Sequence, residues 1–231
     1  MAILVWDSPT RVFHWLLVVC FAGAWLTADS EWLRDIHVAL GYTMAGLILF
    51  RLIWGVVGTR YARFSSLTLS PARVVAYLRS LLTSRPEHHV GHNPAGSVAV
   101  VLMLALAAAA VLTGIVNYEQ VGGRWLSELH EGAAGAMAAL VGVHIAGVLI
   151  SSLLHRENLV RAMVTGYKRG APGAGIRRTH ALVATALVAG VAWGWILEYN
   201  TAPDAAATPA AREASAKVLL DRRLAWHDDD D

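Results

Sequence analysis

Residues 130–154 read HEGAAGAMAALVGVHIAGVLISSLL, an apolar run long enough to cross a bilayer as a helix. His130 and His144 lie fourteen residues apart, so a helix separates them by about 21 Å along its axis and places them on nearly one face. Ionisable side chains inside an apolar span are costly, and imidazole is the commonest metal ligand. The pattern therefore indicates two stacked metal centres. The alternative is that both histidines form hydrogen bonds between helices.

The composition is that of an integral membrane protein. The 231 residues are 56% apolar and the mean hydropathy is +0.48, which is too hydrophobic for an ordinary soluble domain. The net charge of +2 is too small to indicate nucleic-acid binding. The single cysteine, Cys20, forms no intrachain disulfide, and no C-x-x-C-H sequence is present. Any haem is therefore expected to be held without thioether links.

Apolar segments predict five transmembrane helices, and hence an all-α, integral membrane helical bundle. The expected spans are residues 12–27, 37–57, 94–117, 130–154 and 181–199. Three parts follow from them: a four-helix core, residues 1–170; a fifth helix with its lead-in, residues 171–199; and a flexible extracytoplasmic tail, residues 200–231.

Local signals refine the helix starts. Ser8 is the expected cap of the first helix, with Pro9 at its first position, and this helix is expected to be retained rather than cleaved as a signal peptide. Residues 70–83 carry apolar side chains at helical spacing among arginines. They predict an amphipathic helix that lies in the membrane interface.

The placement of basic residues predicts the orientation. Residues 58–93 contain five lysines or arginines and residues 155–180 contain six, against one in each of the two other connections between spans. Basic connections stay on the cytoplasmic side. We therefore expect an inner-membrane protein of a bacterium, with a cytoplasmic N-terminus and a periplasmic tail.

This orientation pairs the histidines of the spans by depth. His37 and His130 both lie near the outer ends of their spans, whereas His14 and His144 both lie deeper, toward the cytoplasm. Each pair comes from two helices, as bis-histidine ligation of a haem requires. Zinc would need a closed four-ligand cluster, which a separation of about 21 Å forbids. Arg51, near the far end of the second span, is expected either to extend to the interface or to pair with an anionic group of a cofactor.

Several motifs together resemble the prokaryotic cytochrome b561 and nickel-iron hydrogenase b-type cytochrome family. They are SPTRVFHW from Ser8, HVALGY from His37, FRLIWGVVG around Arg51, GHNPAG from Gly91, and the segment from His130 to Gly170. The resemblance covers most of residues 6–170. It does not extend to the fifth span and the tail, which leaves the partner open.

The resemblance implies a core that binds two b haems through His14, His37, His130 and His144. It places Arg51 and the His92–Asn93 segment near the cytoplasmic haem, at its propionates or at a quinone pocket. Arg11, inside the SPTRVFHW motif, completes the candidate cofactor-binding residues.

The leading hypothesis is a redox subunit that carries electrons between an outer partner and the quinone pool of the bilayer. The partner would be a periplasmic cytochrome c or the catalytic subunit of an oxidoreductase, and the chain could also form an oligomer. One alternative is a stand-alone enzyme such as a superoxide:quinone oxidoreductase, although the acidic residues Asp29, Glu31 and Asp35 disfavour attraction of an anion. Another is a haem-free transporter or assembly factor whose histidines relay protons.

Overall fold

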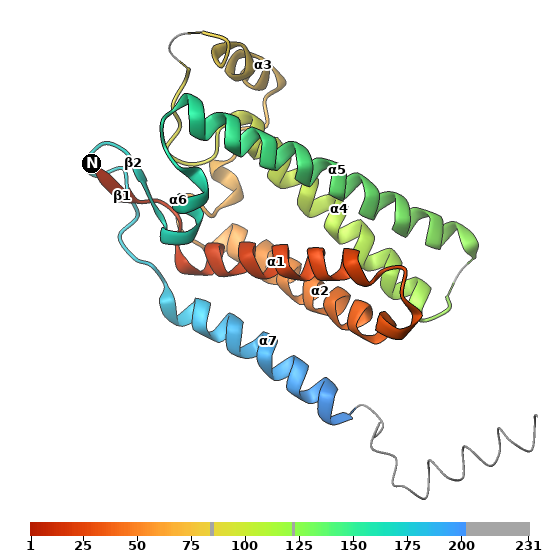
Figure 1. Cartoon of the computed structure of the whole chain (residues 1–231). Helices are drawn as coiled ribbons and strands as arrows, with labels where there is room; N and C mark the ends of the chain where they lie inside the picture. Colours follow the sequence, from red (N-terminus) through yellow and green to blue (C-terminus); the bar gives the residue numbers. More distant parts are fainter. Residues whose placement is uncertain (84–85, 122, 202–231) are drawn as a thin grey trace, which may run out of the picture. The chain divides into compact units, whose positions relative to one another are not determined.

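The computed structural model describes residues 1–83, 86–121 and 123–201, and within them it is mostly helical. Five of the described helices are long and apolar enough to cross a membrane, which confirms the predicted all-α membrane bundle. They are α1 (Ser8–Thr27), α2 (Arg34–Val57), α4 (Pro94–Tyr118), α5 (Arg124–Leu154) and α7 (Ala181–Thr201) (Figure 1).

The helix starts depart from the sequence expectation by a few residues. Asp7, not Ser8, caps α1, because its side chain accepts a hydrogen bond from the amide of Thr10, and Pro9 lies in the first turn. The helix α5 begins six residues before His130 because Leu126 is buried and extends the packed face. Similarly, α2 begins before His37. Both histidines therefore lie inside regular helix, where the backbone fixes their direction.

Shorter elements close one end of the bundle. They are the helices α3 (Pro71–Ser80) and α6 (Leu159–Thr165), the 3-10 turn η2 (Phe64–Ser66), and the antiparallel strands β1 (Ala2–Leu4) and β2 (Tyr167–Arg169). A second 3-10 turn, η1 (Glu31–Leu33), joins α1 to α2 at the opposite end (Figure 1). The helix α3 falls within the predicted amphipathic segment. The strands and α6 were not predicted. Gly166 ends α6 at a φ of +89°, and its carbonyl accepts hydrogen bonds from the amides of Val5 and Trp6.

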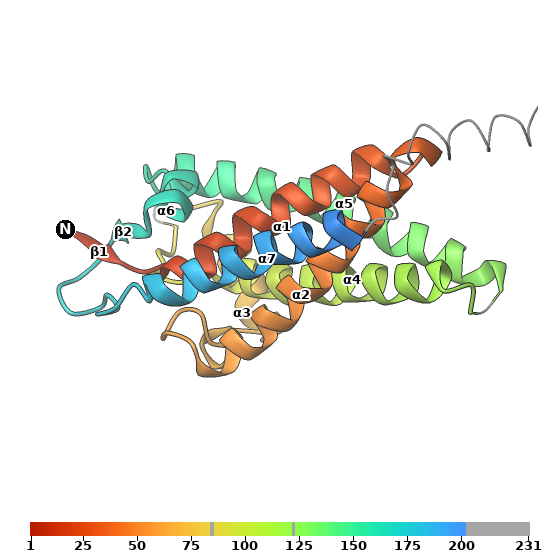
Figure 2. The same cartoon turned by 90° about the horizontal axis from the view of Figure 1, so that it is seen from below.

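The core is built from two helix pairs. The helix α1 packs on α2, α4 packs on α5, and α2 joins the pairs through α4 (Figures 1 and 2). Buried apolar side chains from all four helices, among them Phe13, Leu47, Ala107 and Met137, form one cluster. Among the described residues, the extensive contacts of α5 are with α4 and α6. The candidate ligands thus come from α1, α2 and α5, and α5 does not pack extensively on either of the other two.

The chain divides into two compact units, residues 1–191 and residues 192–231. The first contains the bundle and the start of α7, whose Leu187 and Val191 pack on the core cluster. The second contains the last turns of α7. The predicted tail, apart from its first two residues, lies outside the described part of the chain and stays a prediction.

Candidate functional site

His37 of α2 and His130 of α5 face each other. Their ring centroids are 6.1 Å apart at an interplanar angle of 76°. The Nδ1 atom of His37 lies 2.9 Å from the carbonyl oxygen of Ala24 on α1, and the Nδ1 atom of His130 lies 2.8 Å from the carbonyl oxygen of Ala110 on α4. All four core helices thus contribute to this pair.

These hydrogen bonds decide the chemistry of both rings. A carbonyl oxygen only accepts, so Nδ1 carries the proton in each histidine and the Nε2 lone pair remains available as a metal ligand. A histidine that binds a metal through one ring nitrogen usually donates a hydrogen bond from the other. This hydrogen bond fixes the tautomer and the orientation of the ring. Two metal–nitrogen bonds of about 2 Å plus the two ring radii span about 6 Å, which matches the observed separation.

Each of these two carbonyls also accepts a hydrogen bond from a threonine three residues later in the same helix. The Thr27 hydroxyl donates to the Ala24 oxygen over 3.2 Å, and the Thr113 hydroxyl donates to the Ala110 oxygen over 3.1 Å. Close packing also fixes the His130 ring, because a Cβ atom on Gly114 would lie only 2.9 Å from its Cε1 atom. The backbone of the bundle therefore holds the pair without help from charged groups.

His14 of α1 and His144 of α5 lie close enough to interact electrostatically. Their surroundings differ from those of the other pair. The His14 Nδ1 atom is buried and has no hydrogen-bond partner, and the ring contacts Trp15 edge-on at 5.0 Å. The structure thus brings these two histidines to one region, but leaves at least one ring nitrogen available to a further group.

Other buried polar atoms without partners lie in the same region. Arg51 is only 3% exposed, its guanidinium stacks 4.7 Å above the Phe64 ring, and its Nη1 atom has no acceptor. Gly55 makes this stacking possible, since a Cβ atom there would lie 2.1 Å from Phe64. Arg51 is therefore buried under an aromatic side chain and does not extend to the surface.

His92 contributes a further orphaned atom. It lies just before α4, its ring centroid is 4.7 Å from that of Trp6, and its Nδ1 atom is buried without a partner. Burial lowers the pKa of His92 to about 3, assisted by the positive charges of Arg51 and Lys168 and by His144. The imidazole is consequently neutral at physiological pH.

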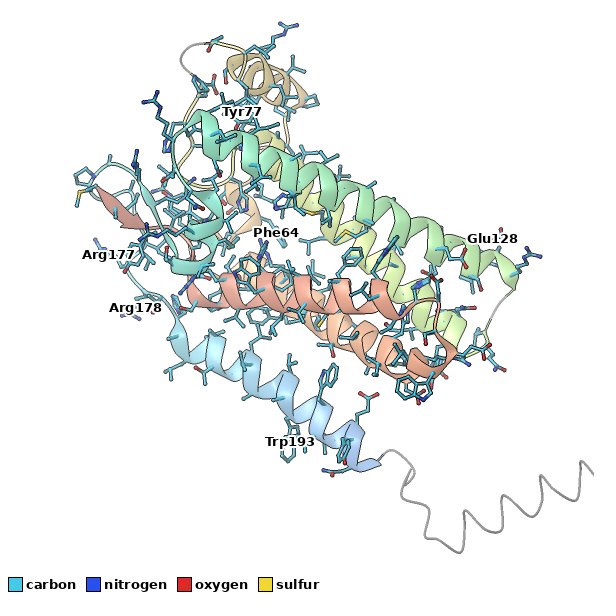
Figure 3. All side chains as sticks on the ribbon, in the orientation of Figure 1. Phe64, Tyr77, Glu128, Arg177, Arg178 and Trp193 are labelled. Carbon is cyan, nitrogen blue, oxygen red and sulfur yellow. The ribbon has the colours of Figure 1, made fainter. Side chains whose placement is uncertain are left out.

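Asn93 and Arg11 have contacts within the protein that account for most of their polar atoms. The Asn93 side chain accepts from the Gly96 amide and donates to the Tyr77 hydroxyl, so it caps α4 and anchors α3. Tyr77, a residue of α3, lies beside the C-terminal end of α5, whereas Glu128 lies near the N-terminal end of that helix (Figure 3). The Arg11 guanidinium donates to the Val164 carbonyl and the Ser8 hydroxyl, while its Nε atom is buried without a partner.

Asp7 was not among the expected site residues, although it organises this end of the bundle. It is 1% exposed. Its carboxylate accepts hydrogen bonds from the Thr10 amide, the Trp54 indole and the Thr59 hydroxyl. The sequence shows it as a residue at a helix entry, but not that the end of α2 returns to it.

Residues 5–166, more than half of the chain, match the sequence profile of the family described as prokaryotic cytochrome b561. The chain belongs to this family. It is therefore a membrane b-type cytochrome that takes part in electron transport, and membership implies haem b as its cofactor.

Individual relatives are distant. A probable Ni/Fe-hydrogenase B-type cytochrome subunit of Azotobacter vinelandii is 26% identical over 72% of this chain and 88% of its own length. The corresponding protein of Cupriavidus necator is 24% identical over 72% and 87%. A probable Ni/Fe-hydrogenase 1 B-type cytochrome subunit of Escherichia coli K12 is 25% identical over 50% of this chain and 60% of its own length. No solved structure is significantly similar to the chain.

The residues of this b-type cytochrome fit haem b in two respects. His37 and His130 leave both Nε2 atoms free, and the separation of their ring centroids suits two rings bound to one metal ion. A Cβ atom on Gly41, one turn after His37, would meet no protein atom within 4 Å, so no neighbouring helix occupies this face.

Proposed function

We propose that this chain carries electrons between a redox partner on the outer side of the inner membrane and the quinone pool, using two b haems with two histidine ligands each. The observation that carries the proposal is the geometry of His37 and His130, whose Nδ1 protons are fixed on carbonyls and whose Nε2 atoms are free. His14 and His144 are the corresponding ligands of the second haem. Bound haem b supplies reversible one-electron chemistry at iron.

The protein residues have distinct roles in this proposal. His37 and His130 are oriented before any ligand binds, because the Ala24 and Ala110 carbonyls hold their rings. These hydrogen bonds also make Nε2 a better electron donor to a metal.

At the other pair, Arg51 presents a buried guanidinium with an unused donor, and His92 presents a neutral ring with an unpartnered Nδ1 atom. Charged donors form short, strong hydrogen bonds with carboxylates. Arg51 and His92 are therefore suited to anionic groups of the haem, or to a quinone bound beside it.

The partner and the orientation rest on other observations. The basic connections predict that His14 and His144 lie toward the cytoplasm and that His37 and His130 lie toward the outer face. The relatives are named as subunits of Ni/Fe-hydrogenases. The proposed outer partner is accordingly the catalytic subunit of an oxidoreductase or a periplasmic cytochrome c.

Reduced-minus-oxidised spectra together with a haem assay of the purified chain test this function. We expect b-type bands and about two haems per chain, and loss of both in a His130→Ala, His144→Ala double variant. His155→Ala, at the end of the same helix, is the matched control and should keep both. Unchanged spectra in the double variant would contradict the proposal. A colourless wild type would support a haem-free transporter, and oxidation of superoxide with quinone by the chain alone would support a stand-alone enzyme.

A further inference from the structure

A groove of about 480 Å³ lies on the side of the bundle where α1, α6 and α7 meet. Its apolar walls come from Val12, Leu16 and Val19 on α1, Val164 on α6 and Val188 on α7. Several of these side chains are exposed, among them Val19 at 64%. The volume falls within the range of ligand sites, about 300–1,000 Å³.

The groove is a built feature, because its three walls are tied together. The Ser8 amide donates to the Thr179 carbonyl over 2.8 Å, which fixes the start of α7 beside the start of α1. The Trp54 ring also contacts His180 at 5.4 Å. On the other wall, Trp15 donates from its indole to the Met163 carbonyl over 3.3 Å.

One end of the groove is polar and basic. Ser8 and Arg11 line it, and hydrogen bonds from the Arg11 guanidinium to the Val164 carbonyl and the Ser8 hydroxyl hold the side chain in place. Arg177 and Arg178 are exposed and lie in the segment that leads into α7, so they flank this end of the groove without lining it (Figure 3). Arg178 directly precedes Thr179, whose carbonyl is bonded to Ser8.

Negative charge to neutralise this cluster is scarce. The sequence contains no aspartate or glutamate between residues 158 and 197. The nearest acid along α1, Asp7, is buried, and both its oxygens already accept hydrogen bonds. The basic end therefore lacks an anionic partner within the described part of this surface.

We propose that the groove binds one anionic phospholipid, with an acyl chain along the valines and the phosphate at the end that Ser8 and Arg11 line and that Arg177 and Arg178 flank. An apolar channel that ends in a basic pocket between transmembrane helices matches both parts of such a lipid. A quinone has an apolar tail too, but its head is uncharged and gives no reason for several guanidinium groups. The site requires neither haem nor quinone, so it is independent of the proposed function.

Native mass spectrometry of the purified chain with added phosphatidylglycerol or phosphatidylcholine tests the proposal. The Arg177→Gln, Arg178→Gln variant should bind phosphatidylglycerol about five-fold more weakly for each arginine removed, with phosphatidylcholine little affected. Val188→Trp, which fills the groove, should weaken binding of both lipids. The matched control is Arg73→Gln, Arg79→Gln, which removes two exposed arginines from α3 and should bind phosphatidylglycerol like the wild type.

Haem spectra of every variant report whether the bundle is intact, so failure of the lipid site is distinguishable from failure of the electron-transfer function. Wild-type phosphatidylglycerol binding in the Arg177, Arg178 variant would overturn the proposal. Equal weakening in the α3 control would overturn it as well, because the effect would then be one of general charge. Loss of co-purified quinone from Val188→Trp with unchanged phosphatidylglycerol binding would assign the groove to quinone instead.

Discussion

The two histidine pairs differ in how far the protein satisfies their ring nitrogens. At His37 and His130 both Nδ1 atoms donate to main-chain carbonyls. At His14 and His144, nearby buried polar atoms have no hydrogen-bond partner, including the His14 Nδ1 atom and the Arg51 Nη1 atom. One pair is completed by the fold, whereas the other is left incomplete.

The difference has a physical consequence. A buried polar atom without a hydrogen bond costs about 1–3 kcal/mol, and native proteins contain few of them. Several such atoms at one end of a bundle mark a place where a further group supplies the missing hydrogen-bond partners. We therefore expect ligand binding to stabilise the His14 and His144 end more than the His37 and His130 end.

Removal of one ligand from each pair should have the largest effect. His130→Ala and His144→Ala should each retain about one haem in place of two, because each histidine serves a different pair. The residual spectra of the two variants should differ. Haem assay and low-temperature spectra measure this, and equal loss of both haems in either variant would show collapse of the bundle and no division into two sites.

Asp7→Ala should have the next largest effect, confined at first to the His14 and His144 end. The change leaves the Trp54 indole and the Thr59 hydroxyl without their acceptor. Each buried donor left without a partner costs about 1–3 kcal/mol. Thermal unfolding in detergent with haem absorbance as the probe measures it.

The matched control for this change is Asp29→Ala, an exposed aspartate at the other end, which should shift stability by less than about 0.5 kcal/mol. Equal destabilisation by both changes would contradict a special role for Asp7. If Asp7→Ala loses the haem at His37 and His130 before the haem at His14 and His144, then Asp7 supports the other pair and the prediction is wrong.

The sequence was sufficient to predict the spans and the membrane class. Helical spans in lipid must be long and apolar, so composition alone identifies α4 and α5 to within a few residues at most ends. The predicted cap of α1 was wrong by one residue. Asp7 and Ser8 are both good caps, and only the hydrogen bond from the Thr10 amide to Asp7 distinguishes them. The strands were missed because each has only three residues and the two lie far apart in the sequence, at residues 2–4 and 167–169.

The histidines were predictable because each is a costly residue in an apolar segment, and their depths follow from helix geometry. Their supporting contacts were not. The carbonyls of Ala24 and Ala110 carry no sequence signal, and the closeness of Gly114 to His130 depends on how α4 crosses α5. Asp7 is visible only as a helix cap until α2 returns to it.

Gly114→Ala should perturb only the His37 and His130 pair, and more moderately. The new methyl group would lie 2.9 Å from the His130 ring, so the ring or the helix must shift. Overpacking of this kind costs about 1–3 kcal/mol. We expect two haems to remain, with a changed electron paramagnetic resonance signal for one of them.

Gly190→Ala is the control for this change, because a Cβ atom there would meet nothing within 4 Å. Its resonance spectrum should match the wild type. The prediction fails if the changed signal of Gly114→Ala is lost when His144→Ala is added and kept when His130→Ala is added. The perturbed haem would then be the one at His14 and His144.

Glu157→Gln should give the smallest effect, at the His14 and His144 end, and its pH dependence has a definite sign. Burial opposes ionisation of Glu157, but hydrogen bonds from the Arg169 amide and His88, together with the charge of Lys168, lower its pKa below the usual 4.5. The fold thus favours the carboxylate, and its contribution is present above about pH 4.5 and is lost as pH falls through the lowered pKa. At pH 7 the variant should be less stable by about 1 kcal/mol, and this gap should narrow on acidification.

Unfolding in detergent at pH 7 and at pH 4 measures the gap. Glu128→Gln, at the opposite end of α5 in an exposed pair with Arg124, is the matched control and should change stability by less than about 0.5 kcal/mol at either pH. A gap that widens on acidification would mean that the fold favours the protonated acid. In that case the contacts with Arg169 and His88 would not stabilise the carboxylate. Burial would then dominate the pKa of Glu157 in the segment between α5 and β2.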